Sequence, residues 1–136
     1  MPDQLDDDTL EFAHRMFDLA RGGGTEELAE NLALGLPANL TNSKGDTLLI
    51  LAAYHNHPAT VAALLAGGAD HSRVNDRGQT ALAAAVFRQN SETINTLLDA
   101  GANPHDGNPS AIATAAFFNL PEMTKLLTER DVPRGE

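Results

Sequence analysis

Apolar residues recur along the chain in the pattern of short amphipathic helices. Leu49 and Ala52 lie three positions apart within an apolar run, which predicts a first short helix. Pro58 suits the first turn of a second helix, and the stripe at 61–65 is apolar at spacings of three and four. Gly68 follows where a helix end favours a left-handed residue. A polar, turn-rich segment comes next, so the unit is helix, tight turn, helix and projecting loop.

The same unit recurs 33 residues later without a gap. A fixed period of this length is the signature of stacked repeats, in which each unit buries its apolar face against its neighbours. The matched positions are Gly45 with Gly78, Thr47 with Thr80, Leu49 with Leu82, Ala52 with Ala85, Val61 with Ile94, Leu64 with Leu97, Leu65 with Leu98, and the run Gly68-Ala69-Asp70 with Gly101-Ala102-Asn103.

Two weaker copies flank this central pair. A shift of 33 back places Gly35 under Gly68 and predicts an N-terminal repeat, and we expect Gly35, Gly68 and Gly101 to close three second helices. At the other end the matching shift is 29, which takes Gly78 to Gly107 and predicts a third loop four residues shorter. We therefore expect one domain, residues 1–136, with four repeats at about 9–41, 42–74, 75–105 and 106–132.

The two central copies resemble the ankyrin repeat, whose motif runs D-x-x-G-x-T-P-L-H-x-A-A-x-x-G-H and ends in L-L-x-x-G-A-D/N. Residues 42–57 read NSKGDTLLILAAYHNH, and residues 75–90 read NDRGQTALAAAVFRQN. The departures are Ile50 and Ala83 for the motif's His, Leu48 and Ala81 for its Pro, and Asn56 and Gln89 for its turn glycine. The resemblance implies an all-α ankyrin-repeat solenoid of four stacked helix-turn-helix repeats with short connecting loops, in a short, stand-alone protein of the bacterial type.

The charge balance excludes several classes of function. Nine Lys and Arg residues against nineteen Asp and Glu give a net charge of −10, which argues against a general binder of nucleic acid or anionic membranes. The absence of cysteine excludes disulfide scaffolds and thiolate chemistry. There is no apolar stretch near the roughly 18 residues of a membrane span, and the acidic N-terminus lacks a secretory layout. We expect a monomeric cytoplasmic protein.

Two motifs could in principle carry chemistry. His55 and His57, with His71 later, could suggest a metal-handling enzyme, but residues two apart on a turn point away from each other. The family resemblance instead implies that His57 makes a structural hydrogen bond to the backbone. The glycines at 22–24 lack the Lys-Ser/Thr of a phosphate loop and suit a turn, with Thr25 as the cap of the next helix. We expect no enzyme and no cofactor or metal.

The resemblance implies that another protein docks on the concave face formed by loop tips and first helices. Aromatic and Arg residues are enriched at protein interfaces, and Tyr54 and Phe87 occupy equivalent positions in adjacent repeats. The alternative is that these two rings only cover the gap between neighbouring helices. The predicted partner-binding residues are Tyr54, Phe87 and Arg88 at the centre, flanked by Lys44, Arg77 and His55, with Asp46, Asp76 and Gln79 beside them.

The acidic N-terminal end supports a second hypothesis. Residues 1–41 hold nine acidic and two basic side chains, including the run from Asp6 to Asp8. The chain could then be a regulator or inhibitor whose acidic end mimics nucleic acid or blocks a basic protein. The simpler interpretation is a solvated capping end, because Asp residues at the start of a helix stabilise its dipole.

Overall fold

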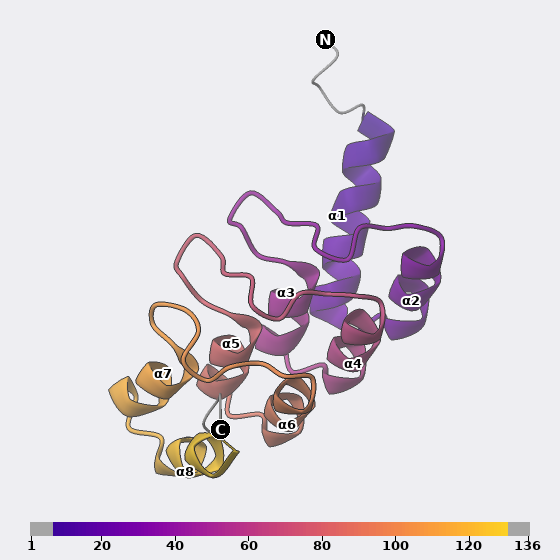
Figure 1. Cartoon of the computed structure of the whole chain (residues 1–136). Helices are drawn as coiled ribbons and strands as arrows, with labels where there is room; N and C mark the ends of the chain where they lie inside the picture. The colour runs from indigo at the N-terminus through magenta and orange to yellow at the C-terminus, as the bar shows by residue number, and fades with distance from the viewer. Residues whose placement is uncertain (1–6, 131–136) are drawn as a thin grey trace.

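The computed structural model describes residues 7–130 and folds them into eight helices, which stack as four side-by-side pairs (Figure 1). The described part contains no β-strand beyond two isolated bridges, so the predicted all-α solenoid is confirmed. The helices are α1 (Asp7–Gly22), α2 (Thr25–Ala33), α3 (Leu48–Tyr54), α4 (Pro58–Ala66), α5 (Ala81–Phe87), α6 (Ser91–Asp99), α7 (Ala111–Phe117) and α8 (Pro121–Arg130).

Hydroxyl side chains fix where the short first helices begin. Thr47, Thr80 and Ser110 are the N-cap residues of α3, α5 and α7, and each accepts a hydrogen bond from the backbone N–H three residues on, at 3.0 to 3.1 Å. Such a bond satisfies a backbone donor that the helix itself leaves unpaired. The expected cap Thr25 is wrong: Gly24 precedes α2, and the Thr25 hydroxyl lies 2.7 Å from that of Thr60.

The end of each second helix follows the sequence prediction. Gly35, Gly68 and Gly101 all have a positive φ, between 98° and 109°, directly after the last turn of α2, α4 and α6. This left-handed conformation is unstrained only for glycine. The prediction that these glycines close three second helices is confirmed.

The last repeat is offset by 30 residues rather than by 29. Its N-cap Ser110 lies 30 positions after Thr80, and its left-handed turn residue Asn119 lies 30 positions after Gln89. Gly78 and Gly107 do match at 29, but one extra residue separates Gly107 from the N-cap. The third inter-repeat loop is therefore three residues shorter than the second, not four.

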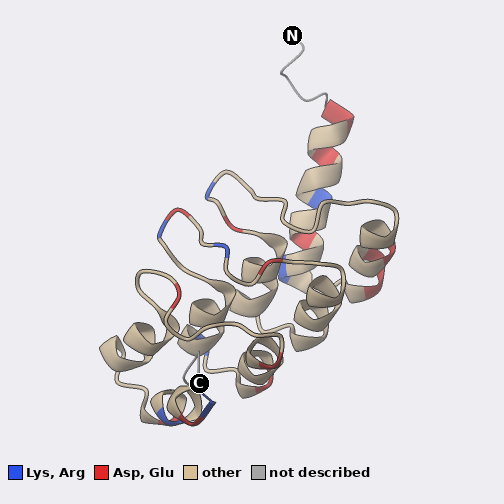
Figure 2. Cartoon of the chain, in the orientation of Figure 1, with Lys and Arg blue, Asp and Glu red and all other residues tan. Residues whose placement is uncertain are grey.

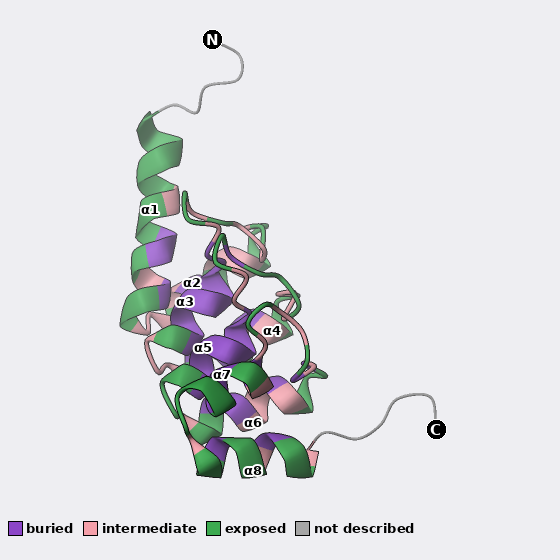
Figure 3. Ribbon diagram, turned by 90° about the vertical axis from the view of Figure 1, so that its left-hand side faces the viewer, coloured by how far each residue is buried: buried purple, intermediate pink, exposed green. Residues whose placement is uncertain are grey.

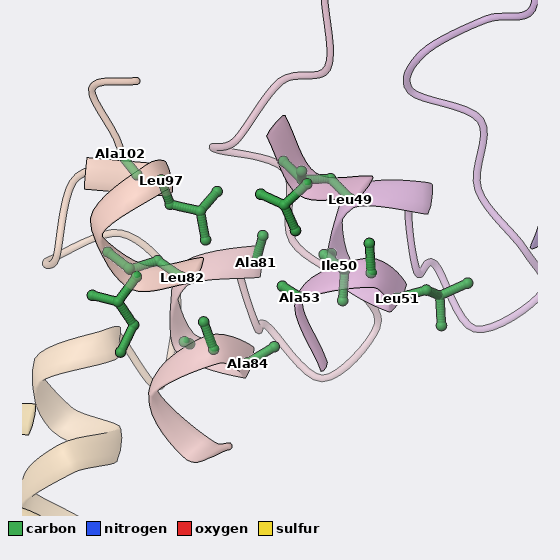
Figure 4. Close-up of a cluster of buried hydrophobic side chains, with 14 of the residues drawn as sticks. Leu49, Ile50, Leu51, Ala53, Ala81, Leu82, Ala84, Leu97 and Ala102 are labelled. Carbon is green, nitrogen blue, oxygen red and sulfur yellow. The ribbon is translucent and has the colours of Figure 1, made fainter. Parts of the chain in front are cut away.

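The core is one cluster of apolar side chains contributed by all four helix pairs, and Figure 4 shows its central part. Leu49 and Leu82, on the first helices, are equally buried, and so are Leu64 and Leu97 on the second helices; none of the four is more than 1% exposed. Equal burial of residues 33 apart is what a true repeat requires. Buried alanines on α3 and α5 let these helices approach closely, and each pair contacts the pairs beside it.

The histidine that the family resemblance assigned to structure does form a backbone contact. His57 Nε2 lies 2.8 Å from the carbonyl oxygen of Arg21, so the turn between α3 and α4 is tied to the end of α1. Of the described residues, no group of three or more His, Cys, Asp or Glu is arranged to hold a metal ion. None of the helices within residues 7–130 is both long and apolar enough to span a bilayer.

Candidate functional site

Three loops between the helix pairs project beyond the first helices and form the rim of one face (Figure 1). We call residues 34–47, 67–80 and 100–110 the finger loops. Asn42 Oδ1 accepts hydrogen bonds from the backbone N–H groups of Lys44 and Asp46, at 2.9 and 3.0 Å. Asn75 does the same one repeat later, for Arg77 and Gln79. The side-chain amide therefore fixes the shape of each tip.

The cations at two adjacent finger tips face solvent. Lys44 and Arg77 occupy equivalent positions of neighbouring repeats, and both are exposed. The two tips are in direct contact, because the N–H of Asp76 donates to the carbonyl oxygen of Lys44 at 3.0 Å. Figure 2 shows basic positions at the tips of the first two finger loops, with an acidic position beside the second. This backbone hydrogen bond keeps the two residues on neighbouring tips.

Two of the predicted site residues are engaged between the fingers instead. Asp46 is only 9% exposed, and its Oδ1 accepts a hydrogen bond from Asn75 Nδ2 at 2.9 Å. The same amide donates to Gln79 Oε1 at 3.0 Å. Buried polar groups need such partners. The bond to Asp46 joins adjacent fingers, whereas Gln79 bonds to Asn75 within its own finger. The Asp76 side chain remains exposed.

Aromatic rings line up across the ends of the first helices. Tyr54 stacks on Phe87 with centroids 6.1 Å apart, Phe87 meets Phe118 edge to face at 5.1 Å, and Phe118 meets Phe117 at 4.9 Å. We call these four residues the aromatic ladder. Tyr54 and Phe87 are 39% and 40% exposed. The rings thus cover one another, as the alternative of a purely structural role expects, and each still has an exposed part.

Arg88 and His55 hold the first ring of the ladder. The Arg88 guanidinium lies 5.1 Å from the Tyr54 ring centroid, and its Nη1 donates to the Tyr54 carbonyl oxygen at 3.0 Å. The His55 ring packs edge-on against the same tyrosine, with centroids 5.2 Å apart. Burial, and then the positive charges of Arg21, Arg88 and His57, hold the pKa of His55 below its ordinary value. His55 therefore favours its neutral form.

A groove of about 870 Å³ lies between α1 and the first two finger loops. Leu10, Ala13, His14 and Phe17 of α1 contribute to one side of it. It brings together most of the predicted binding residues, namely Lys44, Asp46, Tyr54, His55, Arg77 and Gln79. Phe87, Arg88 and Asp76 lie outside its lining and continue the same face.

Sequence reasoning missed Phe117 and Phe118, the most exposed rings of the ladder. A shift of 29 pairs Phe87 with Ala116, whereas the observed offset of 30 pairs it with Phe117. The signal was present as an aromatic residue at the end of each of α3, α5 and α7. The α1 side of the groove was also missed.

The acidic N-terminal end lies at the start of α1. Asp7 and Asp8 occupy its first turn, where a carboxylate interacts favourably with the helix dipole. Asp6 lies outside the described residues. No observation on residues 7–130 favours a nucleic-acid mimic over this structural role.

Comparison with known proteins agrees with this geometry. Residues 16–108, more than half of the chain, match the family described as ankyrin repeats (3 copies). A protein of Pseudomonas aeruginosa that is named as an ankyrin repeat protein is 55% identical over 58 residues. That match covers 43% of this chain and 34% of the relative, so the chain spans only about a third of the relative's length. The chain belongs to the ankyrin-repeat family.

Proposed function

We propose that this chain is a non-catalytic binding module and that a partner protein docks on its concave face. Ankyrin repeats are in general protein–protein interaction modules, and their family is non-catalytic. The observation that carries the assignment to this face is the aromatic ladder, whose rings are all at least 39% exposed. A partner that covers such rings removes their apolar surface from water, and this favours binding. One copy of the chain supplies the whole face, so the proposal needs only a monomer.

The ladder also has the rigidity of an interface anchor. Tyr54 is held on one side by the stacked ring of Phe87 and on the other by His55, while Arg88 covers it and bonds to its backbone. Side chains that are already ordered lose little rotamer freedom when a partner binds. Aromatic residues and Arg are the residue types that most often dominate binding free energy.

The test compares partner capture by the wild-type chain and by a Tyr54→Ala/Phe87→Ala variant. Protein retained from the source cells is identified first, and its dissociation constant is then measured for both forms. We expect the double variant to bind at least about 2 kcal/mol more weakly, the scale of interface hot spots. Leu34→Ala is the matched control, because Leu34 is the most exposed of the large apolar side chains described and follows the second helix α2. Unchanged binding by a folded double variant would refute the proposal.

A further inference from the structure

We propose that the groove between α1 and the finger loops takes an acidic segment of the partner, with its carboxylates at the finger tips and apolar side chains toward Tyr54. The inference rests on the proposed function and adds the chemistry of the partner. Three features of the groove support it. The unpaired cations Lys44 and Arg77 lie on one side, the Tyr54 ring lies within the groove, and the other side is formed by α1, which begins with acidic residues.

Most arginines of the described chain form an ion pair, whereas the two cations at the finger tips do not. Arg15, Arg21, Arg73 and Arg130 each have a carboxylate 2.6 to 3.5 Å away. Across residues 7–130, neither Lys44 nor Arg77 has an acidic group at ion-pair distance. In a chain of net charge −10, two adjacent unpaired cations form a local site that attracts an anionic partner.

Repeat geometry sets the spacing that the partner needs. Lys44 and Arg77 are equivalent positions of neighbouring repeats, whose tips are in contact through the backbone. Neighbouring helices pack about 8–10 Å apart, so the repeat places the two residues at about that spacing. A segment in the polyproline II conformation has three residues per turn and rises about 3.1 Å per residue. Two carboxylates three positions apart in such a segment lie on the same side, about 9 Å apart, and would meet the two cations together.

The opposite side of the groove gives the partner a direction. α1 has 16 residues where α3, α5 and α7 have seven each, and it extends beyond the other helices (Figure 3). Leu10, Ala13, His14 and Phe17 face the groove at helical spacing. Asp7 lies three residues before Leu10 and so shares their face. A partner carboxylate is disfavoured near this end of α1 and favoured at the fingers.

The probes are three synthetic peptides of about 12 residues, long enough to cross both tips when extended. The first has Glu three positions apart with Leu between, the second has Lys in place of Glu, and the third has Gln. Binding is measured by fluorescence anisotropy at low salt. We expect the Glu peptide to bind at least about tenfold more tightly than the Gln peptide, with the Lys peptide weakest and the difference lost in about 0.5 M salt. Equal binding of all three peptides, or binding of none, would overturn the proposal.

Charge variants assign the effect to the groove. Lys44→Glu and Arg77→Glu should each weaken binding of the Glu peptide about tenfold, whereas Lys125→Glu, an exposed cation on α8, should leave it unchanged. Asp7→Lys should tighten binding about threefold. Asp8→Lys, in the same first turn but on another face of α1, should not. Equal effects at Lys44 and Lys125 would overturn the proposal.

The failure of this inference is distinguishable from failure of the proposed function. If the Tyr54→Ala/Phe87→Ala variant loses the cellular partner but Lys44→Glu and Arg77→Glu retain it at full affinity, the concave face binds protein and the acidic partner is wrong. If all of these variants bind the cellular partner normally, both proposals are wrong.

Discussion

The aromatic rings of Tyr54 and Phe87 lie almost parallel, with 8° between their planes and 6.1 Å between their centroids, although 33 residues separate them in the chain. Each residue ends the first helix of its repeat. The register of the repeats therefore brings the two rings together. Their contact is part of the fold as well as of the candidate binding face.

This contact predicts an energetic coupling between the two rings. In a double-mutant cycle of Tyr54→Ala and Phe87→Ala, we expect a coupling free energy of about 0.5–1.5 kcal/mol in urea unfolding, the range of aromatic pairs. The control cycle pairs Tyr54→Ala with Phe117→Ala, because Phe117 packs against Phe118 instead. Additive losses in the first cycle would show that the two rings do not stabilise each other.

Substitutions at the centre of the stack and at the start of α1 should differ in their effect on the free energy of unfolding. Leu97 is fully buried, so Leu97→Ala should lower the free energy of unfolding by about 2–5 kcal/mol. Asp7 is exposed, and Asp7→Asn should change it by no more than about 0.5 kcal/mol. Denaturant unfolding of both variants checks this. Losses of equal size would place Leu97 outside the core.

Gly23 and Gly22 form a matched pair at the end of α1. Gly23 has a φ of +80°, and a Cβ there would lie 2.8 Å from Nδ1 of His57, whose Nε2 is bonded to Arg21. Gly23→Ala should therefore cost more than about 1 kcal/mol in unfolding free energy. A Cβ on Gly22 would meet nothing within 4 Å, so Gly22→Ala should be neutral or stabilising. Thermal unfolding of the two variants separates these outcomes, and a cost at Gly22 as large as at Gly23 would refute the explanation.

His55 predicts how stability depends on pH. Burial and the charges of Arg21, Arg88 and His57 lower its pKa in the folded state below the ordinary value of 6.5. The unfolded chain then binds the proton more readily, so stability is full above about pH 6.5 and is lost as the pH falls through that value. In urea unfolding, His55→Gln should show a shallower loss between about pH 7.5 and 5 than the wild type. Identical pH profiles would contradict this account.

Much of the fold could be predicted from the 33-residue period, because it fixes which side chains are equivalent. Leu64 and Leu97 were paired from the sequence and have the same burial in the structure. Gly68 was placed at a helix end because few other residues tolerate its backbone conformation. These features follow from local constraints that repeat along the chain.

The rest depended on features without a repeated counterpart. One extra residue before Ser110 shifts the last repeat by one position, and glycine matching alone cannot detect it, which is why Phe117 was missed. The long α1 has no equivalent in the other repeats, so periodicity could not predict its side of the groove. The hydrogen bond from Asn75 to Asp46 also joins different repeats, and only the folded structure shows that this carboxylate is engaged.

Photo-cross-linking from the concave face is the most direct test of the central claim. A photoreactive phenylalanine analogue replaces Phe87, which is 40% exposed, and a second form carries it in place of Ala62, exposed on the second helix α4. Both are irradiated in the source cells. Our account predicts a discrete adduct with one partner protein from position 87 and none from position 62. An adduct that forms from position 62 and not from position 87 would contradict it.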